Sequence, residues 1–222
     1  GKSCDLMLVF VVTDKSKGSK GTSGFIVEKG MPGFEVGKKE SKLGIRASDT
    51  VSVSFENCRV PAANRIGDEG MGFKIALTAL NSGRIGVAAQ ALGIAQGAFE
   101  EAVKYSKERE QFNKPIAKFQ AIQFKIARMA TDIETARLLL YSAAAKKDRH
   151  ENFIKEAAMA KLHCSEVAVR TTLEAIQIHG GYGYVKEYPV ERFMRDSKIT
   201  TIYEGTNEVM HLIIAENVIG RI

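Results

Sequence analysis

The stretch Phe73–Arg109, FKIALTALNSGRIGVAAQALGIAQGAFEEAVKYSKER, decides the fold class. Its apolar residues recur at helical spacing over a length far greater than that of a strand, which indicates one long helix. Residues 119–147 and 152–180 show the same periodicity. A fourth, shorter helix is predicted from about Asn207 to Val218. The chain is therefore expected to be largely helical from residue 72 onward.

Helix-breaking residues separate these segments. Asn113-Lys114-Pro115 ends the first predicted helix, and Gly180-Gly181 with Gly183 ends the third. Four helices with wide apolar faces predict an up-and-down bundle, and the excess apolar surface indicates packing in an oligomer.

The first 65 residues have the pattern of strands instead. DLMLVFVVT (Asp5–Thr13) is a short apolar run, and SGFIVEK and TVSVSFENCRVP follow it, with Pro61 ending the last strand. Because strands precede helices rather than alternate with them, the sequence predicts an α+β chain with two domains and argues against a Rossmann fold. We expect residues 1–65 to be part of an antiparallel β-domain and residues 66–222 to be the helical bundle domain.

Composition limits the function classes. The chain has 222 residues, 45% of them hydrophobic, and a formal charge of +6. Its basic residues are interleaved with acidic ones, which indicates a mixed-charge surface and not a nucleic-acid site. Cys4, Cys58 and Cys164 fit reduced thiols, the four histidines form no metal-binding motif, and no apolar run is long enough to span a bilayer. The start GKSCDLMLVFVV has almost no residues before a strand, so we expect a fragment that lacks its N-terminal part.

Glu204 is the main candidate for catalysis. It can be an ordinary acid before a helix, with Thr206 or Asn207 as the cap. It can also be a general base, because Gly205 frees the backbone to direct the carboxylate inward and Tyr203 excludes water. The residue pattern alone leaves both interpretations open.

Three further features have two interpretations each. KEREQFNKP (Lys107–Pro115) is either a solvated basic helix end or a phosphate site, with Arg109 on a pyrophosphate and Phe112 against a flat ring. The glycines within residues 177–196 form either a helix cap or a close approach to a ligand, and they do not match GxGxxG. Arg84 either pairs with an acid or faces a polar ligand.

Three segments together resemble the acyl-CoA dehydrogenase family, most closely its short-chain or butyryl-CoA branch. They are LNSGRIGVAAQALGIAQGAFEEAVKYSKEREQF, QIHGGYGYVKEYPVERFMRDSKITTIYEGTNEV and TVSVSFENCRVPAANRIGDEGMGF. The resemblance covers essentially the whole chain. It implies an FAD flavoprotein of fatty acid β-oxidation, a homotetramer or homodimer, that converts a saturated acyl-CoA to a trans-2-enoyl-CoA and passes electrons to an electron-transferring flavoprotein. It also implies a location in the bacterial cytoplasm or the mitochondrial matrix.

The resemblance assigns a role to individual residues. Glu204 matches the family's catalytic base; other members place that base on the first bundle helix, where this chain has Gly83. The residues that match FAD contacts are Arg109, Gln111, Phe112, Gln177, Gly181 and Thr206. The first five of them resemble contacts to a neighbouring subunit's cofactor, and Thr206 resembles a contact to the cofactor in the same subunit as Glu204. The residues that match the acyl-CoA pocket are Arg84, Tyr203 and Gly205.

The chain differs from the family's usual sequence at two places, and two other functions are considered beside acyl-CoA dehydrogenation. Asn81 stands where relatives often have Asp, and Val209–His211 differs from the usual Ile-Gln-Arg. The alternatives are a noncatalytic helical module that only oligomerises, and an acyl-CoA oxidase. The acyl chain length is left open, because one methylene changes discrimination by only about 1–3 kcal/mol.

Overall fold

The computed structural model describes residues 1–220. The chain forms two compact units, one of residues 1–42 and 46–80 and one of residues 43–45 and 81 onward. The division falls within the first long helix, and the predicted domain boundary at residue 65 stays a prediction.

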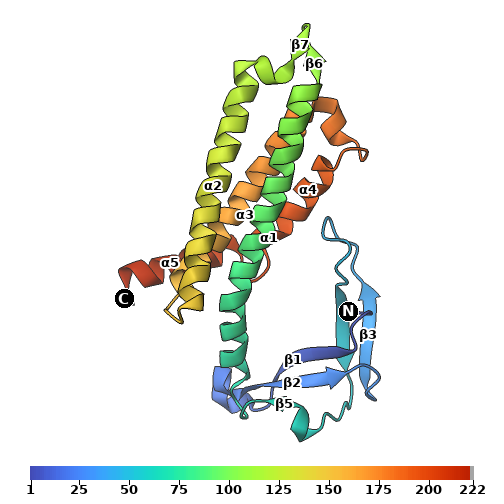
Figure 1. Ribbon diagram of the computed structural model, residues 1–222. Helices are drawn as coiled ribbons and strands as arrows, with labels where there is room; N and C mark the ends of the chain where they lie inside the picture. Colours follow the sequence, from blue (N-terminus) through green and yellow to red (C-terminus); the bar gives the residue numbers. More distant parts are fainter. Residues whose placement is uncertain (221–222) are drawn as a thin grey trace. The chain divides into compact units, whose positions relative to one another are not determined.

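The first unit contains two small antiparallel sheets. Its strands are β1 Leu6–Val12, β2 Thr22–Glu28, β3 Phe34–Lys39, β4 Val51–Phe55 and β5 Arg65–Ile66. β1 pairs with β2 from Leu6 opposite Glu28 to Val12 opposite Thr22, β5 joins the other edge of β2, and β3 pairs with β4 (Figure 1). The predicted antiparallel sheet is confirmed. β3 and β5 were not predicted, and the strand expected to end at Pro61 ends at Phe55.

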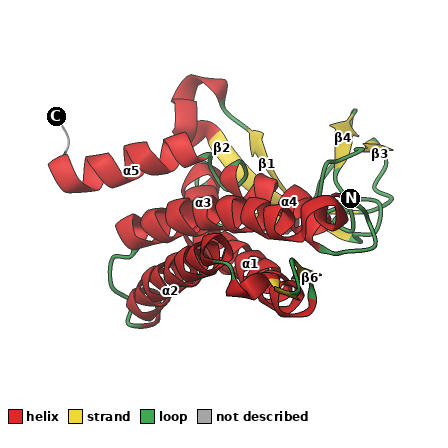
Figure 2. Cartoon of the chain, turned by 90° about the horizontal axis from the view of Figure 1, so that it is seen from above, coloured by secondary structure: helices red, strands yellow, loops and turns green. Residues whose placement is uncertain are grey.

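The helical region contains α1 Gly72–Glu108, α2 Gln120–Asp148, α3 Ile154–His179, α4 Val190–Ser197 and α5 Asn207–Ile219. The long helices α1, α2 and α3 lie side by side and alternate in direction (Figure 1). Figure 2 shows α3 between α5 and the pair α1 and α2. The four predicted helices are confirmed, and α1, α2 and α3 have the predicted up-and-down arrangement. α5 lies across them in Figure 1, and the short α4 is an addition.

Small side chains dominate the core where α1, α2 and α3 meet. Fully buried alanines come from all three helices, namely Ala88, Ala91, Ala95, Ala136, Ala143, Ala160 and Ala168. Leu92, Ile133, Leu140 and Val167 fill the space between them. Because alanine brings helix axes close together and leaves few voids, the core holds the helix backbones in one arrangement.

A tight hairpin joins α1 to α2. β6 Glu110–Gln111 pairs with β7 Lys114–Pro115, so that only Phe112 and Asn113 form the loop. Both loop residues have positive φ angles, 53° and 60°. Two-residue loops of this kind need positive φ at both positions, and the turn therefore projects Phe112 away from the helices.

Candidate active site and cofactor site

The predicted site residues gather in two places of the helical unit. One is the turn before α5, where Glu204 lies against α1. The other is a pocket formed by the end of α1, the β6–β7 hairpin and the glycine-rich turn after α3.

The backbone directs the Glu204 side chain toward α1. Glu204 has φ 57° and Gly205 has φ 95°, so both residues are in the left-handed region. The sequence indicated this freedom for Gly205 only. For a glutamate the conformation costs roughly 1–2 kcal/mol, so its neighbours must hold it.

The Glu204 carboxylate rests directly over Gly83 of α1. A Cβ atom placed on Gly83 would be 2.5 Å from Glu204 Oε2 and 2.9 Å from Cδ. Among the described residues, Oε2 is buried and has no hydrogen-bond partner. Buried polar atoms are nearly always hydrogen-bonded, so an unsatisfied carboxylate oxygen at this position is typical of a functional group.

Arg84 supports the backbone of this turn. Its side chain is 6% exposed, Nε donates to the Glu204 carbonyl oxygen at 3.4 Å, and Nη1 donates to Asn81 Oδ1 at 2.7 Å. Burial lowers the pKa of the Arg84 guanidinium, and the Glu204 charge opposes that shift. Arg84 therefore holds the Glu204 main chain and leaves the carboxylate oxygens free.

Tyr203 and Thr206 lie on the two sides of Glu204 and Gly205. The Tyr203 hydroxyl donates to Gln90 Oε1 on α1, and burial raises the pKa of Tyr203. Thr206 is the N-cap residue of α5, but its side chain makes no capping hydrogen bond. Thr206 therefore does not cap α5 through its side chain.

Lys161 is a site residue that the sequence analysis missed. It is fully buried on α3, and its Nζ donates to Asn207 Oδ1 at 2.9 Å. Burial, with a smaller contribution from Arg84, lowers the pKa of Lys161 to about 8. The available signal was its spacing, because Lys161 shares the apolar face of α3 with Ala157, Cys164 and Ala168.

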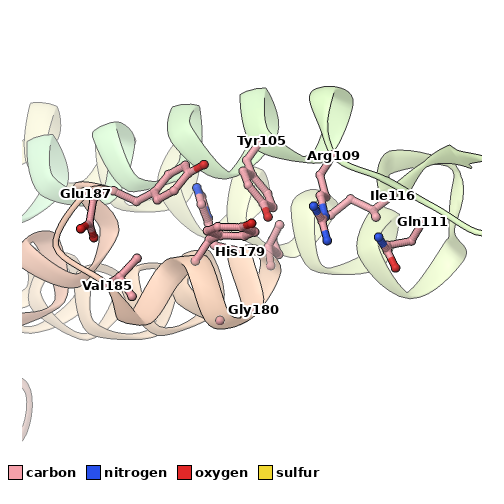
Figure 3. Close-up of a pocket in the computed structure, with 12 residues that line it drawn as sticks. Tyr105, Arg109, Gln111, Ile116, His179, Gly180, Val185 and Glu187 are labelled. Carbon is pink, nitrogen blue, oxygen red and sulfur yellow. The ribbon is translucent and has the colours of Figure 1, made fainter.

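The second place is an open pocket of about 860 Å³. Arg109, Gln111 and Gly181, three of the residues matched to FAD contacts, line it together. In Figure 3, Tyr105 and Arg109 come from α1 and face His179 and Gly180 at the end of α3. Added Cβ atoms on Gly180 and Gly181 would meet nothing within 4 Å, so this side of the pocket has open space.

Aromatic rings form the wall of the pocket. Tyr105 stacks on His179 with ring centroids 4.2 Å apart, Tyr188 lies edge-on to both, and the Arg109 guanidinium lies 5.5 Å from the Tyr182 ring. His179 hydrogen-bonds through Nδ1 to the Ala175 carbonyl at 2.7 Å, and burial lowers its pKa. These rings offer flat surfaces beside one cation, which suits a ligand with a planar ring and an anionic group.

The remaining predicted residues lie elsewhere. Phe112 is 86% exposed at the hairpin tip and contacts Phe119 edge-on with ring centroids 6.1 Å apart. Gln177 is exposed on α3 and does not line the pocket. Thr206 belongs to the Glu204 turn.

Residues 1–220 meet the requirements of neither a membrane-spanning helix nor a metal site. No helix in this range is long and apolar enough to cross a membrane. Within the same described residues, His, Cys, Asp and Glu side chains form no group of three or more that could hold a metal ion.

Comparisons with known proteins agree along the whole chain. Residues 70–219 match the acyl-CoA dehydrogenase C-terminal domain, and residues 1–58 match the acyl-CoA dehydrogenase middle domain. The chain is 57% identical to the short-chain specific acyl-CoA dehydrogenase of Megasphaera elsdenii, over 96% of this chain and 56% of that protein. It is 55% identical to the acryloyl-CoA reductase (NADH) of Anaerotignum propionicum, over 100% of this chain and 56% of that protein.

A solved structure is similarly close. The structure of butyryl-CoA dehydrogenase from Megasphaera elsdenii superposes with a TM-score of 0.97 at 55% identity, over 99% of this chain and 57% of that one. The chain thus spans little more than half the length of the relatives it matches. Sequence, fold and the matched domains together assign this chain to the acyl-CoA dehydrogenase family.

Proposed function

We propose that this chain acts in the FAD-dependent α,β-dehydrogenation of a short-chain acyl-CoA to a trans-2-enoyl-CoA, with Glu204 as the base. The observation that carries the proposal is the Glu204 carboxylate, which rests over Gly83 with a buried and unpartnered Oε2. The name and the high identity of the Megasphaera elsdenii dehydrogenase support the substrate class.

Glu204 removes the proton from the carbon next to the thioester carbonyl. Tyr203, anchored to Gln90, helps to keep water away from the carboxylate, and Arg84 fixes the main chain that carries it. In the described part of the chain the Glu204 N–H donates no hydrogen bond, so it is free to donate to the thioester oxygen as negative charge develops there. A bound flavin would supply the acceptor for the hydride that leaves the next carbon.

The pocket near the hairpin fits part of the FAD. The Arg109 guanidinium suits the pyrophosphate, Gln111 offers an amide, and the open space at Gly181 lets the main chain approach the cofactor. We further propose that Phe112 and Gln177, exposed at the same end of the bundle, contact FAD when a second copy of the chain brings its cofactor there. Thr206 is proposed to contact the flavin beside Glu204.

A second candidate is the reverse reaction, reduction of an enoyl-CoA. It is favoured by the Anaerotignum propionicum relative, whose name is acryloyl-CoA reductase (NADH). The same carboxylate serves both directions, since Glu204 returns the proton that it removes in the forward direction. Comparing an electron-transferring flavoprotein as acceptor with NADH as donor in steady-state assays separates the two. The noncatalytic module and the oxidase are not favoured by these relatives.

The proposed function includes an assembly and a location. We propose a homotetramer or homodimer, because large apolar side chains on α2 and α3 are exposed, among them Leu138, Tyr141 and Leu173. An electron-transferring flavoprotein is the proposed acceptor. The bacterial cytoplasm or the mitochondrial matrix is the proposed compartment.

The test is Glu204→Gln in the full-length protein. Because a general base contributes about 10²–10⁴-fold, we expect turnover to fall by roughly 10³-fold while flavin content and melting temperature stay unchanged. Exchange of the substrate α-proton with deuterated solvent reports the same step without electron transfer. Glu134→Gln is the matched control, because Glu134 is exposed on α2, away from the Glu204 turn. Unchanged turnover in Glu204→Gln contradicts the proposed function.

A further inference from the structure

Lys161 is fully buried, and its hydrogen-bond partner is a neutral amide. Among the described residues, no carboxylate forms an ion pair with its Nζ, and its hydrogen bond is to the neutral Asn207 Oδ1. A buried ammonium costs free energy when no charge pairs with it, and an apolar side chain of similar volume often serves stability better. The contribution of Lys161 is therefore expected in positioning and not in stability.

Asn207 connects Lys161 to the Glu204 turn. Asn207 is the first residue of α5, and its Oδ1 accepts hydrogen bonds from Lys161 Nζ at 2.9 Å and from Ser165 Oγ at 3.1 Å. Lys161 and Ser165 are one helical turn apart on α3. The Ser165 hydroxyl has one proton and also lies 2.9 Å from the Leu162 carbonyl oxygen, so Lys161 is the main donor to Asn207. Lys161, with a smaller contribution from Ser165, therefore fixes the start of α5, where Thr206 provides no side-chain cap.

The opposite side of the turn is held by α1. Tyr203 is anchored to Gln90, and the Glu204 carbonyl accepts from Arg84. The strained residue Glu204 and its neighbour Gly205 thus lie between anchors on α1 and one anchor on α3. Without the α3 anchor, the left-handed turn is free to relax toward ordinary backbone angles.

We propose that Lys161 is a positioning residue for the Glu204 carboxylate, acting through Asn207. This inference rests on the proposed role of Glu204 as base. An ammonium group carries donors and no acceptor, so it also fixes which end of the Asn207 amide faces α3. The charges that act on Lys161 are those of Arg84 and Glu208.

The experiment substitutes Lys161→Met in the full-length holoenzyme. The expected result is a kcat at least about tenfold lower, since displacement of a catalytic group by about 1 Å can cost as much as 10²-fold. KM for the acyl-CoA and flavin content stay within about twofold, and the melting temperature stays equal or rises because a buried charge is removed.

Lys161→Gln keeps a donor and is expected to recover part of kcat. Lys155→Met, on the same helix at a half-exposed position, is the matched control.

The outcomes separate this inference from the proposed function. If Lys161→Met keeps kcat within twofold while Glu204→Gln is inactive, the positioning role is wrong and the base assignment stands. If Glu204→Gln is active, the base assignment itself is wrong. A joint loss of flavin and melting temperature in Lys161→Met overturns the inference in favour of a structural role.

Ser165→Ala tests the same inference if the Lys161→Met variant does not fold. Ser165→Ala removes the second donor to Asn207 Oδ1 with little change in volume. It is expected to lower kcat about two- to fivefold at an unchanged melting temperature. An unchanged kcat in Ser165→Ala then overturns the inference.

Discussion

Glu204 and Phe112 have nearly the same unusual backbone, with φ angles of 57° and 53°, in very different surroundings. Glu204 lies half-buried in a turn that Gln90, Arg84 and the Lys161–Asn207 contact hold in place. Phe112 is 86% exposed at the tip of a hairpin. Strained non-glycine residues persist mostly where function requires them. Contacts within one chain thus hold the Glu204 turn in place. The Phe112 side chain, by contrast, points away from the core of its own chain.

Of the variants that compare these two regions, Gly83→Ala is expected to have the largest effect. It tests how little space the Glu204 carboxylate has beside α1. The added Cβ would be 2.5 Å from Glu204 Oε2, so the flexible carboxylate must move. We expect kcat to fall about 10–100-fold, while the melting temperature does not decrease because alanine is the better helix former.

Gly86→Ala is the control for Gly83→Ala. It lies one turn away on α1, and a Cβ there would meet nothing within 4 Å. Equal kcat values for the two variants, measured in steady state with saturating acyl-CoA, would mean that the carboxylate is not confined as described.

Arg109→Ala tests the open region and has an intermediate expected effect. Removing the guanidinium beside Tyr182 is expected to weaken FAD binding about tenfold, or about 1.4 kcal/mol, because a charge-assisted contact to the pyrophosphate is lost. Flavin titration of the full-length apoprotein measures it. Lys107→Ala, an exposed cation in the last turn of α1, is the control and should bind FAD normally. Equal FAD affinities for the two variants would show that Arg109 does not contribute to FAD binding.

Phe112→Gly has the smallest expected effect and the opposite sign. The substitution relieves roughly 1–2 kcal/mol of left-handed strain and costs about 0.5–1 kcal/mol of glycine backbone entropy. The net stabilisation is therefore at most about 1.5 kcal/mol. We expect the melting temperature of the full-length protein to rise by about 1–3 °C while FAD affinity falls. Phe112→Ala separates the two effects, because it removes the ring and keeps the strain. A lower melting temperature in Phe112→Gly would show that the ring supports the fold.

The helices were predictable because their periodicity extends over many turns, and their ends carry proline and glycine signals. β3 was missed because Gly37 and the lysines beside it interrupt the strand pattern; its partner is β4, and Ser52 approaches Gly37 closely. β5 is only two residues long and has no pattern of its own. Lys161 was missed because a lone lysine in a helix is ordinarily on the surface.

The sequence predicted which residues belong to the candidate site better than it predicted how their side chains are arranged. Arg109, Gln111 and Gly181 meet in one pocket because the end of α1 and the turn after α3 lie at the same end of the bundle. Helix ends can be located from sequence, but side-chain directions cannot, and Gln177 accordingly lies outside the pocket. Likewise, the left-handed backbone of Glu204 depends on contacts from α1 and α3. These residues are far from Glu204 in the sequence, so the local sequence does not predict the contacts.

The close contact between Gly83 and Glu204 limits how sequences of this kind can change. A side chain at position 83 and a carboxylate reaching from position 204 compete for the same volume. Adding a side chain at 83 first displaces the base, and shortening residue 204 first removes it, so each single step is expected to lower activity. The two positions are therefore expected to vary together across related sequences, separated by a barrier that one substitution at a time does not easily cross.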